Sequence, residues 1–82
     1  MIPHKNEFFL YGRKNCHLCD QMKLELDELL QPYQGTCHYI DVDTDPELQH
    51  RYGARVPVLV SGNRELSEIR LNREVVLDFL SN

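Results

Sequence analysis

The sequence predicts a mixed α/β domain with the element order β-α-β-α-β-β-α, in which three helices flank a four-stranded mixed sheet. Two observations carry this prediction. Short apolar runs alternate with segments of helical periodicity through the first half of the chain, which favours parallel strands joined by crossover helices. A Gly62-Asn63 turn then separates two short strand-like segments, a pattern typical of an antiparallel hairpin.

The first half of the chain contains two strand–helix units. Residues 7–11 form a short apolar run that predicts a buried strand. Apolar residues then recur at helical spacing over residues 18–30, with charged residues on the other faces. Apolar and polar residues alternate over residues 37–42 well enough to predict a second strand. Residues 45–52 begin with an aspartate, a proline and a glutamate, which is the signature of a capped helix.

The second half predicts a hairpin and a final helix. Residues 58–60 form the third strand, and the Gly62-Asn63 turn leads into a fourth strand over residues 65–69. Asn72 can cap a last helix whose apolar residues face inward. The predicted domain covers residues 1–82 as one unit, because a chain of 82 residues is long enough for one small core.

Composition limits the partners and the location. The formal net charge is −4 and no basic stripe is present, so we expect no nucleic-acid partner. No apolar stretch approaches the roughly 20 residues of a membrane helix. The N-terminus lacks the apolar core of a secretory signal. Three cysteines cannot form a disulfide framework, and their odd number indicates a reducing compartment. We therefore expect a cytoplasmic monomer without a membrane contact.

The candidate active site is the pair Cys16 and Cys19, at the start of the first predicted helix. Two thiols at this spacing can close and reopen a small disulfide. At a helix N-terminus, unpaired N–H groups and the positive end of the dipole stabilise a thiolate and lower its pKa. Cys16 is therefore assigned as the nucleophile, and Cys19, in the first turn, as the resolving thiol.

Charged neighbours should modulate this thiolate. Arg13 and Lys14 lie just upstream and favour the negative charge, although salt screens exposed charges. His17, inside the pair, stabilises the thiolate when it is protonated and so shifts the redox potential upward, unless it is simply a solvated loop residue.

Val56-Pro57 stands just before the third strand, where a proline fits because no N–H is needed. A trans bond is the ordinary case for an X–Pro peptide. A cis bond would turn the backbone of Val56 toward the cysteine loop, where it could hold an extended substrate by strand-like hydrogen bonds.

The pattern resembles the thioredoxin fold, and most of all its short glutaredoxin-like proteins, over nearly the whole chain. The resemblance rests on the strand-loop-CxxC-helix at 8–30, on the Asp41-Val42-Asp43 segment and on the run from Tyr52 to Leu59. It implies a cis bond before Pro57 and catalytic roles for the two cysteines. It also implies a substrate-binding role for Arg13, where glutaredoxins often have a lysine that meets the glutathione carboxylate.

The sequence departs from glutaredoxins in ways that bear on glutathione. His17 and Leu18 replace the usual Pro-Tyr inside the cysteine pair, and Arg55 stands where a threonine is common. The stretch 67–72 lacks the Gly-Gly-x-Asp segment that grips the γ-glutamyl end of glutathione. We expect dithiol exchange in spite of these departures, but no specificity for glutathione. Glutathione is therefore a doubtful reductant.

Three alternative functions remain open. The cysteines with a histidine could form a zinc site, although Cys37 fits better as a core residue and no second CxxC exists. An iron–sulfur cluster could bridge two protomers through their cysteines. The domain could also be a redox-inert interaction module. Against these, we expect a thiol–disulfide oxidoreductase without a metal or other cofactor, acting on a disulfide-containing protein or a low-molecular-weight thiol compound.

Overall fold

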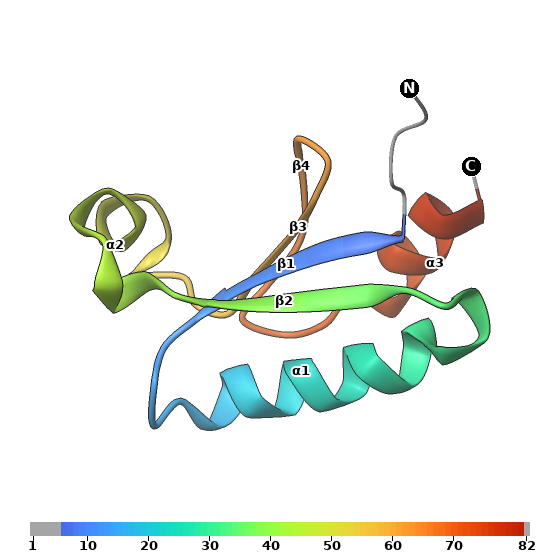
Figure 1. The fold of residues 1–82 in the computed structure, drawn as a ribbon, viewed down its shortest axis with the longest axis horizontal. Helices are drawn as coiled ribbons and strands as arrows, with labels where there is room; N and C mark the ends of the chain where they lie inside the picture. The colour runs from blue at the N-terminus through green and yellow to red at the C-terminus, as the bar shows by residue number, and fades with distance from the viewer. Residues whose placement is uncertain (1–5, 82) are drawn as a thin grey trace.

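The computed structural model describes residues 6–81. It confirms the predicted element order (Figure 1). The strands and helices are β1 (Glu7–Gly12), α1 (His17–Leu30), β2 (Thr36–Asp41), α2 (Pro46–Tyr52), β3 (Val58–Ser61), β4 (Arg64–Glu68) and α3 (Arg73–Ser81). Two single 3-10 turns, η1 (Gln31–Tyr33) and η2 (Val42–Thr44), follow α1 and β2. The prediction for residues 1–5 and 82 as part of the domain lies outside the described residues.

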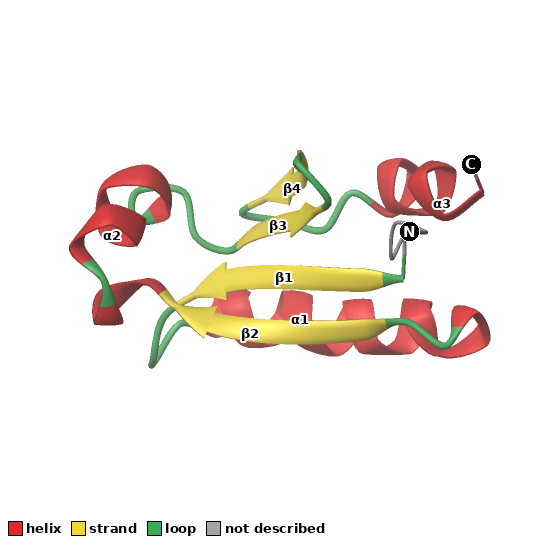
Figure 2. Cartoon of the chain, turned by 45° about the horizontal axis from the view of Figure 1, so that its top comes forward, coloured by secondary structure: helices red, strands yellow, loops and turns green. Residues whose placement is uncertain are grey.

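The four strands form one mixed sheet in the order β2-β1-β3-β4 (Figure 2). β1 and β2 are parallel, whereas β3 is antiparallel to both β1 and β4. This arrangement follows from the connections, because a crossover through α1 makes neighbouring strands parallel and the two-residue turn makes them antiparallel. β1 therefore lies inside the sheet, and its carboxyl end leads directly into the cysteine loop.

The main core lies between one face of the sheet and the helices α1 and α3. Alternate residues of β1 are fully buried, as expected where successive side chains point to opposite faces. Their partners come from β3, β4 and the apolar stripes of both helices. The buried members of this cluster are Phe8, Leu10, Met22, Leu26, Leu30, Leu59, Leu66 and Val76.

The other face of the sheet packs against α2. Tyr11 follows Leu10 of the main core, and Val58 precedes Leu59 of the same core. Because successive side chains of a strand point to opposite faces, Tyr11 and Val58 lie on the other face of the sheet. They form a second cluster with Val42 and with Tyr52 of α2. The rings of Tyr11 and Tyr52 are stacked with centroids 4.3 Å apart. The two clusters show that α1 and α3 cover one face and α2 the other.

The helix starts agree with the predicted caps. The Asp45 carboxylate accepts a hydrogen bond from the N–H of Glu47 at 2.8 Å, with Pro46 at the first position of α2. The Asn72 side chain accepts from the N–H of Val75 at 3.2 Å at the start of α3. These caps satisfy amides that have no partner inside the helix.

Several boundaries differ from the sequence prediction. β2 ends at Asp41, because the aspartate caps the turn η2 that Val42 begins. β4 ends at Glu68 rather than at Ile69, whose backbone takes a left-handed conformation with φ of 68°. α2 ends at Tyr52, as predicted, and its C-cap residue Gly53 has right-handed backbone geometry. In residues 6–81, the longest helices fall short of the length and hydropathy needed to cross a membrane.

Candidate active site

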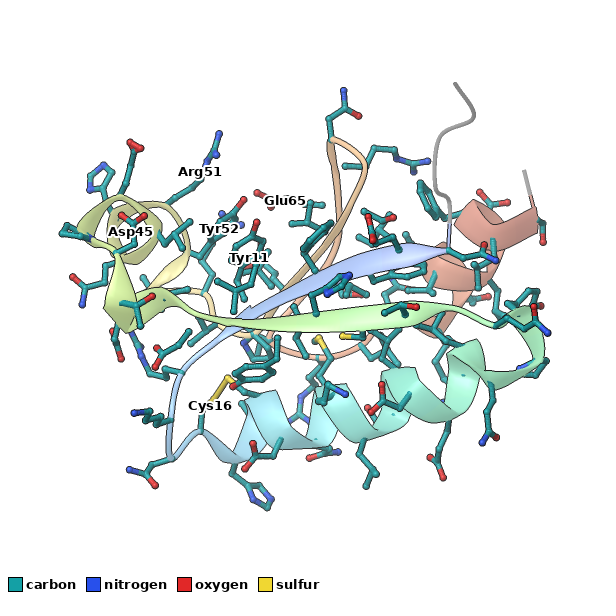
Figure 3. The ribbon with its side chains drawn as sticks, viewed as in Figure 1. Tyr11, Cys16, Asp45, Arg51, Tyr52 and Glu65 are labelled. Atoms are coloured by element: carbon teal, nitrogen blue, oxygen red, sulfur yellow. A yellow bond between two sulfur atoms is a disulfide. The ribbon has the colours of Figure 1, made fainter. Side chains whose placement is uncertain are left out.

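Cys16 caps the N-terminus of α1. Its backbone is extended, and its sulfur accepts a hydrogen bond from the N–H of Cys19 at 3.1 Å. The sulfur atoms of Cys16 and Cys19 are joined in a disulfide, with Cα atoms 5.2 Å apart (Figure 3). The carbonyl of Cys16 accepts the N–H of Asp20 at 3.1 Å. The loop thus places the Cys16 sulfur next to first-turn amides that have no partner inside the helix. A thiolate at this position would be stabilised by these amides and by the positive end of the helix dipole.

The two cysteines differ in exposure. Cys16 is half-buried, whereas Cys19 is fully buried. An incoming sulfur can therefore reach Cys16 more readily than Cys19. This order agrees with the predicted assignment of Cys16 as the attacking thiol, since reactivity in thiol exchange depends on access as well as on thiolate character.

Arg13 connects the cysteine loop to η2 and to the end of α2. Its guanidinium donates to both carboxylate oxygens of Asp43, at 3.2 Å each, and to the carbonyl of Gly53 at 3.0 Å. The same contact lowers the pKa of the Asp43 carboxyl from its ordinary value. Three of the five guanidinium N–H groups are engaged in this way. The remaining two can still face a substrate carboxylate, so the predicted binding role of Arg13 stays a prediction.

Tyr39 holds the same loop from the side of β2. Its hydroxyl donates to the carbonyl of Arg13 at 2.9 Å. A Cβ at position 12 would overlap this ring and would lie 3.1 Å from the sulfur of Cys19, so Gly12 is required for the close approach of tyrosine and cysteine. Burial, with the charge of Asp20, raises the pKa of the Tyr39 hydroxyl above its ordinary value. Neither Tyr39 nor Asp43 was predicted from the sequence as a site residue.

Lys14 and His17 are both exposed on either side of Cys16. Neither residue forms a side-chain hydrogen bond or an ion pair within residues 6–81. Both are therefore available to a solvent-borne substrate, and their modulating roles remain predictions. Asn15, between Lys14 and Cys16, takes a left-handed backbone with φ of 56°, which bends the loop just before the Cys16 sulfur.

The Val56-Pro57 bond is cis, which confirms the prediction. Pro57 is buried and Val56 is half-buried. Within the described part of the chain, the N–H and the carbonyl of Val56 have no backbone partner. An extended chain can use such free groups to add strand-like hydrogen bonds. The Pro57 carbonyl accepts the N–H of Ile69 at 2.7 Å, and Ile69 lines the same cavity as Leu18 of the cysteine motif.

Arg55 fixes the loop that leads into Val56. Its guanidinium donates to Glu65 at 2.8 and 3.2 Å, to Glu68 at 3.2 Å and to the carbonyl of Arg51 at 3.0 Å. It also lies over the ring of Tyr52, 5.6 Å from the centroid. Figure 3 shows Tyr52 and Glu65 across the sheet from Cys16. Arg55 therefore anchors the proline loop to the hairpin, a structural role that the sequence alone did not reveal.

Cys37 packs against the main core from β2 and is half-buried rather than fully buried. Burial raises the pKa of its thiol to about 11. Its register partner on β1 is Phe8, near the start of the strand, whereas Gly12, which lies beside Cys19, ends that strand. In residues 6–81, no group of three or more His, Cys, Asp or Glu side chains is arranged to hold a metal ion.

We expect limiting iodoacetamide at pH 7 to label reduced Cys16 before Cys19 and Cys37. Cys16 is the more exposed member of the pair, and its sulfur accepts a hydrogen bond from a first-turn amide, which favours the thiolate. With a pKa of about 11, Cys37 is thiolate in only about one molecule in ten thousand at this pH. Its labelling should rise about tenfold for each pH unit until its pKa is reached. Peptide mapping measures the order. Equal or preferential labelling of Cys19 would contradict the activation of Cys16.

The sheet order, the cis-proline loop and the disulfide-bonded Cys-x-x-Cys pair at a helix start place the protein in the thioredoxin-fold class. More particularly, the chain belongs to the glutaredoxin-like domain family (DUF836), whose family model matches residues 7–81. This confirms the resemblance that the sequence indicated. No curated protein matches the chain.

Solved structures agree with this family. The chain is similar to protein Ne2328 from Nitrosomonas europaea, with 30% identity, a TM-score of 0.83 and coverage of 96% of this chain and 93% of that one. It is also similar to protein XcR50 from X. campestris, with 33% identity, a TM-score of 0.68 and coverage of 90% and 95%. Thioredoxin 1 from Thermosipho africanus TCF52B is 14% identical over 92% and 94%, with a TM-score of 0.63, and shares the fold.

Proposed function

We propose that this protein is a thiol–disulfide oxidoreductase that reduces disulfides of proteins or of low-molecular-weight thiol compounds. The observation that carries the proposal is the position of Cys16, whose sulfur caps α1 and accepts the N–H of Cys19 at 3.1 Å. This amide and the positive end of the helix favour a thiolate at neutral pH. The greater exposure of Cys16 lets a substrate disulfide approach it.

The exchange takes two steps. The Cys16 thiolate attacks one sulfur of the substrate, which forms a mixed disulfide and releases the second substrate sulfur as a thiolate. Cys19 loses its proton to solvent and attacks the Cys16 sulfur, which forms the internal disulfide and releases the first substrate sulfur. The two cysteines lose two electrons and the substrate disulfide gains them. The product on the protein is the disulfide that joins Cys16 and Cys19 in this structure.

Return to the dithiol needs an external reductant. Two molecules of glutathione can supply the electrons and leave as glutathione disulfide, or a dithiol of a reductase can supply both. We propose a reducing compartment, the cytoplasm, as the location, and we propose no metal or other cofactor for the reaction. The dithiol of Cys16 and Cys19 alone carries the two electrons from the reductant to the substrate.

The groups around the pair supply substrate contacts. We assign the free N–H and carbonyl of Val56 to strand-like hydrogen bonds with the substrate backbone, with Pro57 fixing the turn. Arg13 lies at the base of the loop for a substrate carboxylate. Lys14 and His17, both exposed beside Cys16, stabilise its thiolate when they are positively charged.

A redox titration of the purified protein tests this function. We expect a reversible two-electron transition of Cys16 and Cys19 between about −270 and −120 mV, the range of thioredoxin-fold oxidoreductases. Reduction assays should then show turnover on a protein disulfide, with glutathione or thioredoxin reductase as the electron donor. The absence of a reversible transition would favour a redox-inert interaction module. Bound zinc or iron in protein purified under reducing conditions would favour the metal-binding alternatives.

We expect weak activity with mixed glutathione disulfides in a parallel assay. The stretch 67–72 carries no Gly-Gly-x-Asp segment, and Asn72 donates its N–H to the hydroxyl of Ser67 at 2.9 Å instead of leaving it for a ligand. The rate with a peptide disulfide of similar size should exceed the rate with the glutathione disulfide. Equal or higher activity with glutathione would show that the missing segment is not needed.

A further inference from the structure

The second step of the proposed exchange places a negative charge on a sulfur that solvent does not reach. Cys19 is fully buried, yet it must be a thiolate to attack Cys16. Burial disfavours the charged form of a thiol. Cys37 shows the effect, because burial raises the pKa of this half-buried thiol to about 11. The sulfur of Cys16 accepts a first-turn amide, whereas the sulfur of Cys19 requires a donor of its own.

The hydroxyl of Tyr39 lies beside the Cys19 sulfur. A Cβ at position 12, which Gly12 lacks, would lie 2.8 Å from Cζ of Tyr39 and 3.1 Å from the sulfur of Cys19, and it would be closer still to the hydroxyl oxygen. The oxygen and the sulfur are therefore separated by less than the sum of these two distances. Once the disulfide is open, the sulfur can turn about the Cα–Cβ bond, and one water molecule can also bridge such a gap. The hydroxyl is thus within reach of a Cys19 thiolate.

The Tyr39 hydroxyl carries a proton that it can redirect. It donates to the carbonyl of Arg13 at 2.9 Å, and the hydrogen of a hydroxyl rotates to suit its acceptor. An ordinary tyrosine, with a pKa of about 10, is already protonated at neutral pH. Burial, with the negative charges of Asp20 and Asp41, raises the pKa of Tyr39 further, and the guanidinium of Arg13 is paired with Asp43. A charge-assisted bond is roughly twice as strong as a neutral one, so a thiolate competes well with the carbonyl.

We propose that the Tyr39 hydroxyl donates a hydrogen bond to the Cys19 thiolate during disulfide exchange. The proposal rests on the proposed function and adds a residue to it. In the resolving step, the proton of Cys19 passes to solvent and the hydroxyl turns from the Arg13 carbonyl to the sulfur. The Cys19 sulfur then bonds to the Cys16 sulfur, and the bond from Cys16 to the substrate breaks and releases the substrate as a thiolate. Tyr39 keeps its own proton throughout.

The same hydrogen bond acts in the opposite direction, when a reductant thiolate attacks Cys16. The bond between Cys16 and Cys19 breaks, and the Cys19 sulfur leaves as a thiolate that the hydroxyl stabilises. A thiol of lower pKa is the better leaving group. Tyr39 therefore favours attack of the reductant on Cys16, which is also the more accessible sulfur.

The first test measures the ionisation of Cys19 directly. Cys16→Ser combined with Cys37→Ser leaves Cys19 as the single thiol, since the chain has three cysteines. The Cβ chemical shift of Cys19 then reports its ionisation as the pH is raised. Adding Tyr39→Phe should raise the pKa of Cys19 by about one unit, a tenfold loss of thiolate at pH 7, because a hydrogen bond to a charged group is removed. An unchanged pKa would overturn the proposal.

Tyr33→Phe is the matched control. It removes the same hydroxyl from a side chain that is 39% exposed, against 38% for Tyr39, but it lies in η1 beyond the far end of α1. This variant should leave the titration unchanged. The charged groups near the cysteine pair, which include Lys14, His17 and Asp20, are present in every variant, so their own titration cancels in the comparison. An equal shift in both variants would overturn the role of Tyr39.

The second test separates the two steps of exchange in Cys37→Ser protein. An aromatic disulfide that releases one coloured thiolate when Cys16 attacks and another when Cys19 attacks serves as the substrate. Tyr39→Phe should leave the first release unchanged and slow the second about threefold to fivefold at pH 7, because the loss of thiolate outweighs the greater nucleophilicity of a more basic sulfur. The difference should shrink as the pH rises. Equal slowing of both releases would leave Tyr39 only its bond to the Arg13 carbonyl.

The two tests distinguish this proposal from the proposed function. If the second coloured thiolate never appears in the Cys37→Ser protein, but Tyr39→Phe still raises the pKa of Cys19, the resolving role of Cys19 fails and the hydrogen bond stands. If both thiolates appear at the same rates with and without the Tyr39 hydroxyl, and the pKa of Cys19 does not change, the oxidoreductase function stands and the role of Tyr39 is wrong.

Discussion

We expect Cys16→Ser to abolish disulfide exchange, with a loss of about a thousandfold or more, as in other enzymes without their nucleophile. A serine hydroxyl at the N-cap position accepts the N–H of Cys19 as the sulfur does, so the start of α1 is kept. Only the thiolate that attacks the substrate is lost. The readout is the rate of reduction of a protein disulfide, with circular dichroism to verify that the fold is retained.

Cys19→Ser should behave differently. The first step still occurs, but no thiol remains to attack the mixed disulfide on Cys16. The substrate should stay covalently attached, with a mass that equals the sum of the two chains. Cys37→Ser is the matched control, because this thiol packs against the core and lies outside the pair. Its activity should equal that of the wild-type protein. A mixed disulfide on Cys19 in Cys16→Ser would reverse the assignment of the two roles.

We expect Phe8→Ala to remove much of the stability of the protein. Phe8 is fully buried on β1, inside the sheet, and packs edge-to-face against Phe79 with ring centroids 6.0 Å apart. Truncating such a ring costs about 3–5 kcal/mol, out of the roughly 5–10 kcal/mol expected for a small domain. Urea unfolding of the oxidised protein should show a midpoint lower by about 2–3 M.

Phe9→Ala provides the comparison at the next residue of the same strand. The side chain of Phe9 lies on the other face, half-buried, and stacks on His38 with centroids 5.1 Å apart. Its removal should cost only about 1–2 kcal/mol, because less apolar surface returns to water. Similar losses for the two variants would mean that the two sides of β1 are equally packed, against the burial pattern of the strand.

The site was only partly predictable from the sequence. Cys16 and Cys19 were recognisable because the helix cap, the spacing and the apolar stripe are local signals. The cis bond before Pro57 came from the resemblance, since a proline at a strand start is usually trans. Tyr39 could have been suspected, because it shares the core-facing register of β2 with Cys37. Asp43 belongs to the Asp41-Val42-Asp43 segment that carries the resemblance, but nothing in the sequence indicates Arg13 as its partner, since acidic residues are common throughout this chain.

Periodicity, capping residues and turn dipeptides determined the order of strands and helices, because these signals act over a few residues. Tertiary structure alone decided which distant groups meet at the site. Arg13 donates a hydrogen bond to Asp43, thirty residues away, and the Tyr39 hydroxyl donates to the Arg13 carbonyl. Both contacts exist only because β1 and β2 are paired. Ile69 would avoid a left-handed backbone in isolation. Its hydrogen bond to Pro57 and the pairing of β3 with β4 hold it there, because together they outweigh its local preference.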